Sequence, residues 1–170
     1  MADVMAMLQL LGAGSVGGLV SQYVTAAPER RQTRTRAREA MVALEEARWS
    51  RGQEDEWQQL RERVHAFESI AIVAGVPRPA AQWYVRTTVA LHLESRRELS
   101  EHGNPDLAGI PLRYLDAFAS ATDLIYWILW HPQLARLTWR RRLKRSKAEV
   151  TAATADSATI RDALTRRTAI

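Results

Sequence analysis

The chain has 170 residues, with 24 lysines and arginines against 19 aspartates and glutamates, which gives a formal net charge of +5. This length favours one domain with short appendages, and a hydrophobic content of 46% excludes wholesale disorder. The sequence contains no cysteine. That absence excludes a disulfide framework, thiolate zinc sites, iron–sulfur clusters and a cysteine nucleophile.

The N-terminal segment contains an uncharged run over residues 4–27. About 20 apolar residues are enough for a helix to cross the hydrocarbon core of a bilayer, so residues 1–28 are predicted to form a membrane-spanning helix. Two alternatives remain open. One is a cleaved signal peptide, although the basic start of such peptides is missing, and the other is a buried helix of a soluble protein.

Glycines within this run allow two further interpretations. Residues 12–17 have the G-x-G-x-x-G spacing of a dinucleotide-binding turn, but the strand and acidic residue that should follow are missing, so we expect no cofactor. In a membrane helix, Gly14 and Gly18 would share one face, and small residues at this spacing let two helices approach closely. The spacing therefore predicts a homo-oligomer formed through the N-terminal helix.

Arginines directly after the uncharged run determine the expected orientation. They are Arg30, Arg31, Arg34, Arg36 and Arg38. Because basic flanks stay on the cytoplasmic side, we expect an inner-membrane protein with its N-terminus outside and its C-terminal domain in the cytoplasm. The same arginines are candidates for binding the anionic headgroups of a lipid bilayer.

The remaining chain has the periodicity of helices with one apolar face. Residues 29–52 are predicted to form a basic juxtamembrane helix with an apolar stripe at Ala37, Ala40, Met41, Leu44 and Ala47. A helical bundle is then expected over residues 53–149. Its clearest stripe comprises Trp57, Leu60, Val64, Phe67, Ala71 and Ala74. Gly75 and Pro77 follow, in the order typical of a helix end.

Three more helices are expected after this break. The first covers about residues 80–99, with Tyr84, Thr88, Leu91 and Ser95 on one face. The second begins near Pro111 and carries Leu112, Leu115, Phe118, Thr122, Ile125 and Leu129. The third covers residues 133–150, and residues 150–170 predict a flexible tail. The expected fold class is all-α, an N-terminal transmembrane helix followed by a small cytoplasmic helical bundle.

A second basic cluster lies in the last of these helices. It comprises Arg140, Arg141, Arg142, Lys144 and Arg145. Clustered basic residues beside an aromatic residue such as Trp139 suit a membrane surface, nucleic acid, or simply a solvated surface without a ligand. If the protein is anchored in a membrane, binding of lipid requires fewer assumptions. The alternative is a soluble helical protein that binds nucleic acid through residues 136–147.

Candidate catalytic and metal motifs are incomplete. His92 and Glu94 have the H-x-E spacing of zinc deaminases, whose other ligands include cysteines. His65 and Glu68 have the spacing of a di-iron site that needs a second such pair. No nucleophile elbow or phosphate-binding loop occurs. We therefore expect no metal, no cofactor and no enzymatic activity.

The order of these features resembles a known type of protein. A short N-terminal membrane helix with an arginine-rich exit, a long helix, the pair Phe67-Glu68 and the Gly75-Val76-Pro77 break are similar to bacterial and prophage-borne single-pass membrane-anchored helical proteins. The resemblance covers the layout of residues 8–143 and implies an inner-membrane location without a reaction. The expected function is binding or scaffolding at the membrane.

Overall fold

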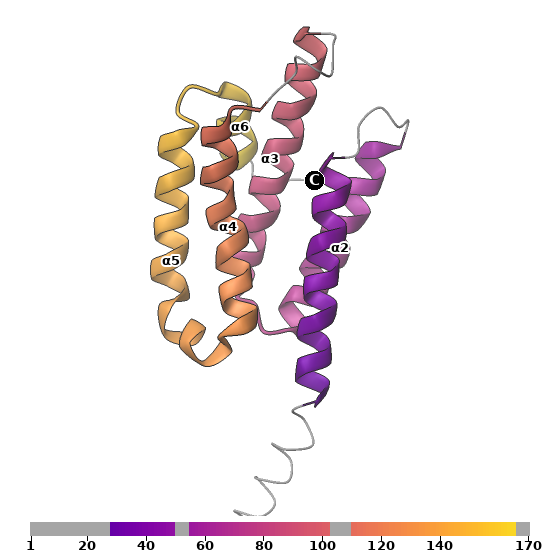
Figure 1. Cartoon of the computed structure of the whole chain (residues 1–170), viewed down its shortest axis with the longest axis vertical. Coiled ribbons are helices and arrows are strands. Elements are labelled where there is room, and N and C mark those ends of the chain that lie inside the picture. Colours follow the sequence, from indigo (N-terminus) through magenta and orange to yellow (C-terminus); the bar gives the residue numbers. More distant parts are fainter. Residues whose placement is uncertain (1–27, 50–54, 103–109, 166–170) are drawn as a thin grey trace, which may run out of the picture.

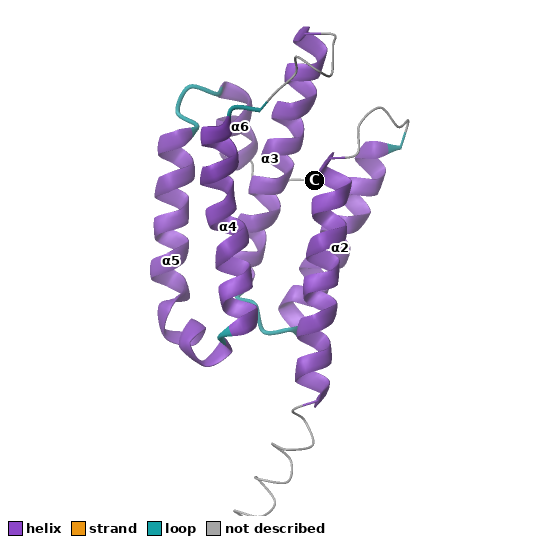
Figure 2. Ribbon diagram, viewed as in Figure 1, coloured by secondary structure: helices purple, strands orange, loops and turns teal. Residues whose placement is uncertain are grey.

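The computed structural model describes residues 28–49, 55–102 and 110–165. All regular secondary structure in these residues is helical, which confirms the all-α class (Figure 2). A first helix covers residues 28–49, and five labelled helices follow in Figure 1: α2 (Glu56–Val73), α3 (Arg78–His102), α4 (Leu112–Trp130), α5 (Pro132–Ala153) and α6 (Ala158–Thr165).

No helix within these ranges is both long and apolar enough to cross a bilayer. The predicted membrane helix over residues 4–27 lies outside the described residues. The same applies to Gly14 and Gly18, and to the glycine-rich turn that resembles a dinucleotide-binding motif.

Helix 28–49 packs as part of the bundle. Its predicted stripe is buried, because Ala37, Met41 and Leu44 are at most 1% exposed and Ala40 packs partly against the same core. An apolar face of this kind must be covered by neighbouring helices. The predicted boundary at residue 53, between a juxtamembrane helix and a separate bundle, therefore does not divide two units.

The end of α2 is formed as its sequence predicts. Gly75 has a φ of +87°, a conformation that side chains with a Cβ rarely adopt. The backbone N–H of Val76 donates to the carbonyl of Ala71 at 2.9 Å, and that of Gly75 donates to Ile72 at 3.0 Å. These bonds satisfy carbonyls that the end of a helix leaves without partners, and α3 begins three residues later.

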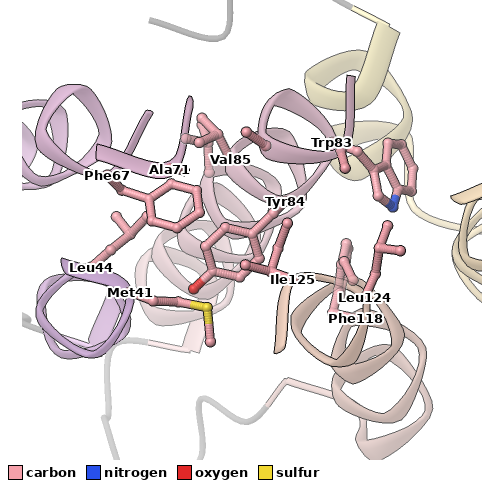
Figure 3. Close-up of a cluster of buried hydrophobic side chains, with 14 of the residues drawn as sticks. Met41, Leu44, Phe67, Ala71, Trp83, Tyr84, Val85, Phe118, Leu124 and Ile125 are labelled. Atoms are coloured by element: carbon pink, nitrogen blue, oxygen red, sulfur yellow. The ribbon is translucent and has the colours of Figure 1, made fainter. Parts of the chain in front are cut away.

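The core is centred on aromatic and aliphatic side chains from four helices. Figure 3 shows Tyr84 of α3 between Phe67 of α2 and Ile125 of α4, with Met41 and Leu44 of helix 28–49 beside them. The rings of Phe67 and Tyr84 meet edge to face with their centroids 4.9 Å apart, a favoured arrangement for aromatic pairs. The α2 and α3 stripes are thus confirmed as core faces.

The structure corrects the face predicted for α4. Leu112 is 76% exposed, because it lies at the very start of the helix, whereas Phe118, Ile125 and Leu129 are buried as expected. The buried face also contains residues that the predicted stripe omitted: Tyr114, Ala117, Ala121, Leu124 and Ile128. This wider face allows α4 to pack against both α3 and α5.

The predicted flexible tail is wrong for the residues that the structure describes. Residues up to Ala153 belong to α5, and α6 packs against α3 with Ile160 fully buried. The Ser157 hydroxyl accepts a hydrogen bond from the N–H of Ile160 and donates one to Glu94 of α3, at 3.2 and 3.1 Å. This N-cap and the apolar contact fix a helix of only eight residues.

Candidate functional site

Two arginine-rich segments that are a hundred residues apart in the sequence meet at one end of the bundle. The start of helix 28–49, the turn between α2 and α3, and the turn between α4 and α5 all lie at the lower end in Figure 1. We call this the basal end, comprising residues 28–38, 72–78 and 128–139. The first basic block and Arg136, which precedes the second basic cluster on α5, are therefore neighbours in space.

A groove of about 770 Å³ opens at the basal end. Helix 28–49 and α5 form its two basic walls, and the turn after α2 forms a third side. The residues that line it are Glu29, Arg30, Arg31, Thr33, Arg34, Val73, Ala74, Gly75, Pro77, Ile128, Pro132, Gln133, Ala135, Arg136 and Trp139.

Helical periodicity explains why arginines face this groove. Arg34 lies three residues before the buried Ala37, so both are on the face of helix 28–49 that turns toward the core. The core face thus continues past the end of the apolar bundle as a basic face. On α5, Ala135 is buried while Arg136 and Trp139 lie beside it along the same groove wall.

The groove has a strong excess of positive charge. Its lining includes four arginines and one glutamate. Within the described ranges no carboxylate forms an ion pair with Arg31, Arg34 or Arg136. Helix 28–49, α3 and α5 begin at this end while α2 and α4 end there. Two pairs of macrodipoles therefore largely offset one another, and the one remaining N-terminus adds only about half a positive charge to the four arginines. The positive potential therefore comes mainly from the guanidinium groups.

Exposed apolar side chains are concentrated at the basal end. Among the described residues, large hydrophobic side chains are exposed at Val42, Trp49, Ile72, Val73, Leu112, Trp130, Leu134 and Leu137. Five of these belong to the basal end, and Leu137 is the most exposed at 85%. A concentration of exposed large apolar side chains at one end is a feature of sites that contact a protein or a membrane.

Other arginines of the first predicted block serve different roles. Arg38 is half-buried, and its guanidinium lies 4.2 Å from the ring centroid of Trp130. This cation–π contact links helix 28–49 to the last residue of α4. Arg36 is exposed and does not line the groove. Of the first block, only Arg30, Arg31 and Arg34 therefore reach it.

The second predicted block is spread around α5 instead of forming one face. Arg141, Arg142 and Arg145 line a separate groove of about 490 Å³ between α4 and α5, which also contains two acidic side chains, Asp123 and Glu149. Arg145 pairs with Glu149 at 2.7 Å. This second groove is therefore closer to neutral than the basal groove.

The remaining residues of this block contact an indole ring or solvent. Arg142 lies 4.0 Å from the ring centroid of Trp127, and Arg140 lies 5.5 Å from that of Trp139. Lys144 is exposed and lines neither groove. The five basic side chains consequently do not converge on one ligand.

His92 and Glu94, the residues of the H-x-E motif, are used in structural contacts. Nδ1 of His92 lies 3.1 Å from the carbonyl oxygen of Arg48, and Nε2 lies 3.3 Å from Oε1 of Glu56. Glu94 contacts Arg97 and Ser157. In the part of the chain that the structure describes, no three His, Asp or Glu side chains are grouped closely enough to hold a metal ion.

Sequence reasoning missed Arg136 and Trp139 as residues of the basal groove. The helical spacing could have identified this face. The buried stripe of α5 contains Leu143, Ser146 and Val150, and continuing it toward the start of the helix in steps of four residues reaches Trp139 and Ala135. Extending the stripes of both helices to their first turns would have identified the inward-facing arginines. The sequence pattern does not show which two helices pack against each other, because this depends on the tertiary structure.

Comparison with family models, curated proteins and solved structures finds no match for this chain. The functional inference therefore depends on the geometry of the basal end.

Proposed function

We propose that the protein binds an anionic membrane surface through its basal end, as a membrane-anchored binding or scaffolding protein without a catalytic step. One observation carries this proposal: exposed apolar side chains occur at the same end of the described bundle as Arg31, Arg34 and Arg136, which form no ion pair with a carboxylate in the described ranges. Binding at a lipid interface depends on both apolar burial and attraction to anionic lipid. Each basic residue near such a surface contributes about 1 kcal/mol.

Residues 4–27 are the proposed membrane anchor. The uncharged composition of this run supports the proposal, as does the position of residue 28 at the basal end. An anchor that ends at residue 27 would hold the basal end, and not the opposite end, against the bilayer. The arginines that follow favour the cytoplasmic face of the inner membrane.

The anchor and its orientation can be tested in cells. We expect membrane association that resists carbonate extraction, and protection of the C-terminal domain from protease in right-side-out vesicles. Release by carbonate would contradict the anchor, and digestion of the domain would contradict the orientation. Replacing Gly14 and Gly18 by Ile should reduce association in a bilayer reporter, if these glycines form the proposed helix contact.

Nucleic acid is the competing partner for the basic residues of α5. The exposed leucines of the basal end favour lipid, because a phosphate backbone gains nothing from Leu134 and Leu137. Arg145 is paired with Glu149 and Arg142 stacks on Trp127, which reduces what the second block can offer to phosphates.

The natural absence of cysteine allows a direct test of which surface faces the membrane. A polarity-sensitive dye is attached to Leu137→Cys at the basal end or, as a matched control, to Leu112→Cys at the opposite end. These leucines are 85% and 76% exposed. The full chain is mixed with vesicles of phosphatidylcholine, vesicles containing equal parts of phosphatidylcholine and phosphatidylglycerol, or duplex DNA.

We expect the dye at position 137 to shift its emission to the blue on the anionic vesicles, less on the zwitterionic ones, and not with DNA. The dye at position 112 should not respond. An equal response at both positions would refute docking through the basal end. A response at position 137 to DNA but not to vesicles would establish the alternative partner.

A further inference from the structure

The basal groove has features that general attraction to a charged surface does not require. It is a concave site of about 770 Å³ with arginines on two different helices. We propose that this groove binds a phosphate monoester carried on a small polar body. The group is found in lipid headgroups such as that of phosphatidic acid and in soluble sugar phosphates. A lipid source rests on the proposed membrane function, whereas a soluble source does not.

The charge of the groove favours a dianion. Arg31 and Arg34 come from helix 28–49 and Arg136 from α5, and none of the three forms an ion pair with a carboxylate in the described ranges. Guanidinium groups present a planar fork of donors that fits the oxygens of phosphate. A phosphate monoester carries up to two negative charges and three terminal oxygens, so it can engage arginines from both walls at once.

The size and lining of the groove argue for a ligand larger than phosphate itself. A volume of about 770 Å³ lies within the range of small-molecule sites. Ile128 and Ala135 provide buried apolar surface, and Trp139 contributes a half-exposed ring. Thr33 and Gln133 add groups that can bond hydroxyls of the ligand body.

The walls of the groove are held by the core and not by long loops. Arg34 is one turn from the fully buried Ala37, and α5 starts with Pro132, whose fixed φ suits the first turn of a helix. The Gly75 turn is closed by two backbone hydrogen bonds. Binding groups mounted on such rigid elements need little reorganisation to receive a ligand.

The test uses the full chain with ¹⁵N-labelled tryptophan, reconstituted in nanodiscs. One arm adds glycerol 3-phosphate to phosphatidylcholine discs, with glycerol as its control. The other arm compares discs containing phosphatidic acid with discs containing phosphatidylglycerol, whose phosphate is a diester. The indole N–H of Trp139 reports on the groove, and that of Trp83, which is bonded to Ser146 inside the bundle, is the internal reference.

We expect phosphatidic acid to shift the Trp139 signal more than phosphatidylglycerol, and glycerol 3-phosphate to shift it in a saturable manner. The response to glycerol 3-phosphate should strengthen as pH rises through about 6, where a phosphate monoester gains its second charge. A response to glycerol 3-phosphate alone would identify a soluble ligand. Shifts of equal, non-zero size with the two lipids, or no response in either arm, would overturn the proposal.

Two matched triple variants separate the groove from general surface charge. The variant Arg31→Gln/Arg34→Gln/Arg136→Gln should weaken glycerol 3-phosphate binding about a thousandfold, since each of the three charge-assisted hydrogen bonds is worth roughly a factor of ten. The variant Arg36→Gln/Lys144→Gln/Arg161→Gln removes the same charge from exposed positions outside the groove and should change binding by less than about threefold.

Equal losses in the two triple variants would refute a specific site. Their thermal unfolding midpoints should match that of the natural chain, which confirms that both variants fold. The dye at position 137 reports docking separately. Docking without a Trp139 response would overturn the groove alone, and a Trp139 response without docking would overturn only the membrane function.

Discussion

The Tyr84 hydroxyl donates a 2.7 Å hydrogen bond to Oε1 of Glu45 and thereby links α3 to helix 28–49 inside the core. Tyr84 is 1% exposed, and Glu45 also forms an ion pair with Arg48. Burial, reinforced by the negative charge of Glu45, raises the pKa of the Tyr84 hydroxyl well above its ordinary value. The bond is therefore stable only while Tyr84 keeps its proton.

This relationship predicts a loss of stability in alkaline solution. Above pH of about 10 the unfolded chain loses the Tyr84 proton while the folded chain keeps it, so the free energy of unfolding falls by about 1.4 kcal/mol per pH unit from this group. Urea unfolding across this pH range measures the slope. Tyr84→Phe should reduce the slope relative to the natural chain. Identical slopes in the variant and the natural chain would contradict the prediction.

The packing of α6 against α3 predicts that removing the buried side chain of Ile160 strongly lowers the stability of the fold. Ile160→Ala should lower the free energy of unfolding by about 2–5 kcal/mol, as expected for a buried aliphatic residue. Leu164→Ala, at a half-buried position on the same helix, should cost less. Denaturant titration gives both values. If the two substitutions have equally small effects, α6 does not contribute to the core.

A chain of two side-chain hydrogen bonds, one buried and one part-buried, joins α3, α4 and α5. The indole N–H of Trp83 donates to the Ser146 hydroxyl at 3.0 Å, and that hydroxyl lies 2.8 Å from Oγ of Ser120. Ser146→Ala leaves the buried indole donor without its acceptor and should cost about 1–3 kcal/mol. In a double-mutant cycle with Trp83→Phe, we expect a coupling energy of at least about 0.5 kcal/mol. Additive effects would show that this bond is not a stabilising one.

The turn after α2 predicts a purely conformational penalty at Gly75. A Cβ built at this position meets no heavy atom within 4 Å, so only the positive φ opposes a side chain. Gly75→Ala should lower stability by about 1–2 kcal/mol. Gly75→Asn should cost less, because Asn tolerates the left-handed region better than Ala. Thermal unfolding distinguishes them, and an Asn variant as unstable as the Ala variant would point to a steric cause.

Strong periodicity made most of the described fold predictable. Leu60, Val64 and Phe67 mark the core face of α2, and the stripe of helix 28–49 is equally regular. The prediction of a flexible tail was wrong because α6 is short. Its Ile160 and Ala163 are stabilised by a contact with α3 that no local sequence pattern reveals. The prediction that Leu112 belongs to the core was wrong for the opposite reason. The periodic apolar pattern of α4 continues to the first residue of the helix, where no neighbouring helix covers the side chain.

The basal groove was only half predictable. The arginines of residues 30–34 were recognised as ligand-binding candidates from their charge, but their position across from Arg136 depends on the packing of distant helices. Charge alone also overestimated how many residues of the second block could bind a ligand, because Arg142 contacts Trp127 and Arg145 contacts Glu149. The sequence shows where charged residues lie along the chain, whereas packing determines which of them can bind a ligand.

The place where helix 28–49 begins determines how strong the affinity of the groove has to be. Glu29, the second residue of that helix, lines the groove, so the proposed anchor and the proposed site are separated by a single residue. An anchor joined this closely to the site presents headgroups to the groove at a raised effective concentration, because the second binding event becomes intramolecular. A headgroup that binds weakly in free solution would then occupy the groove for much of the time once the chain is held at a bilayer.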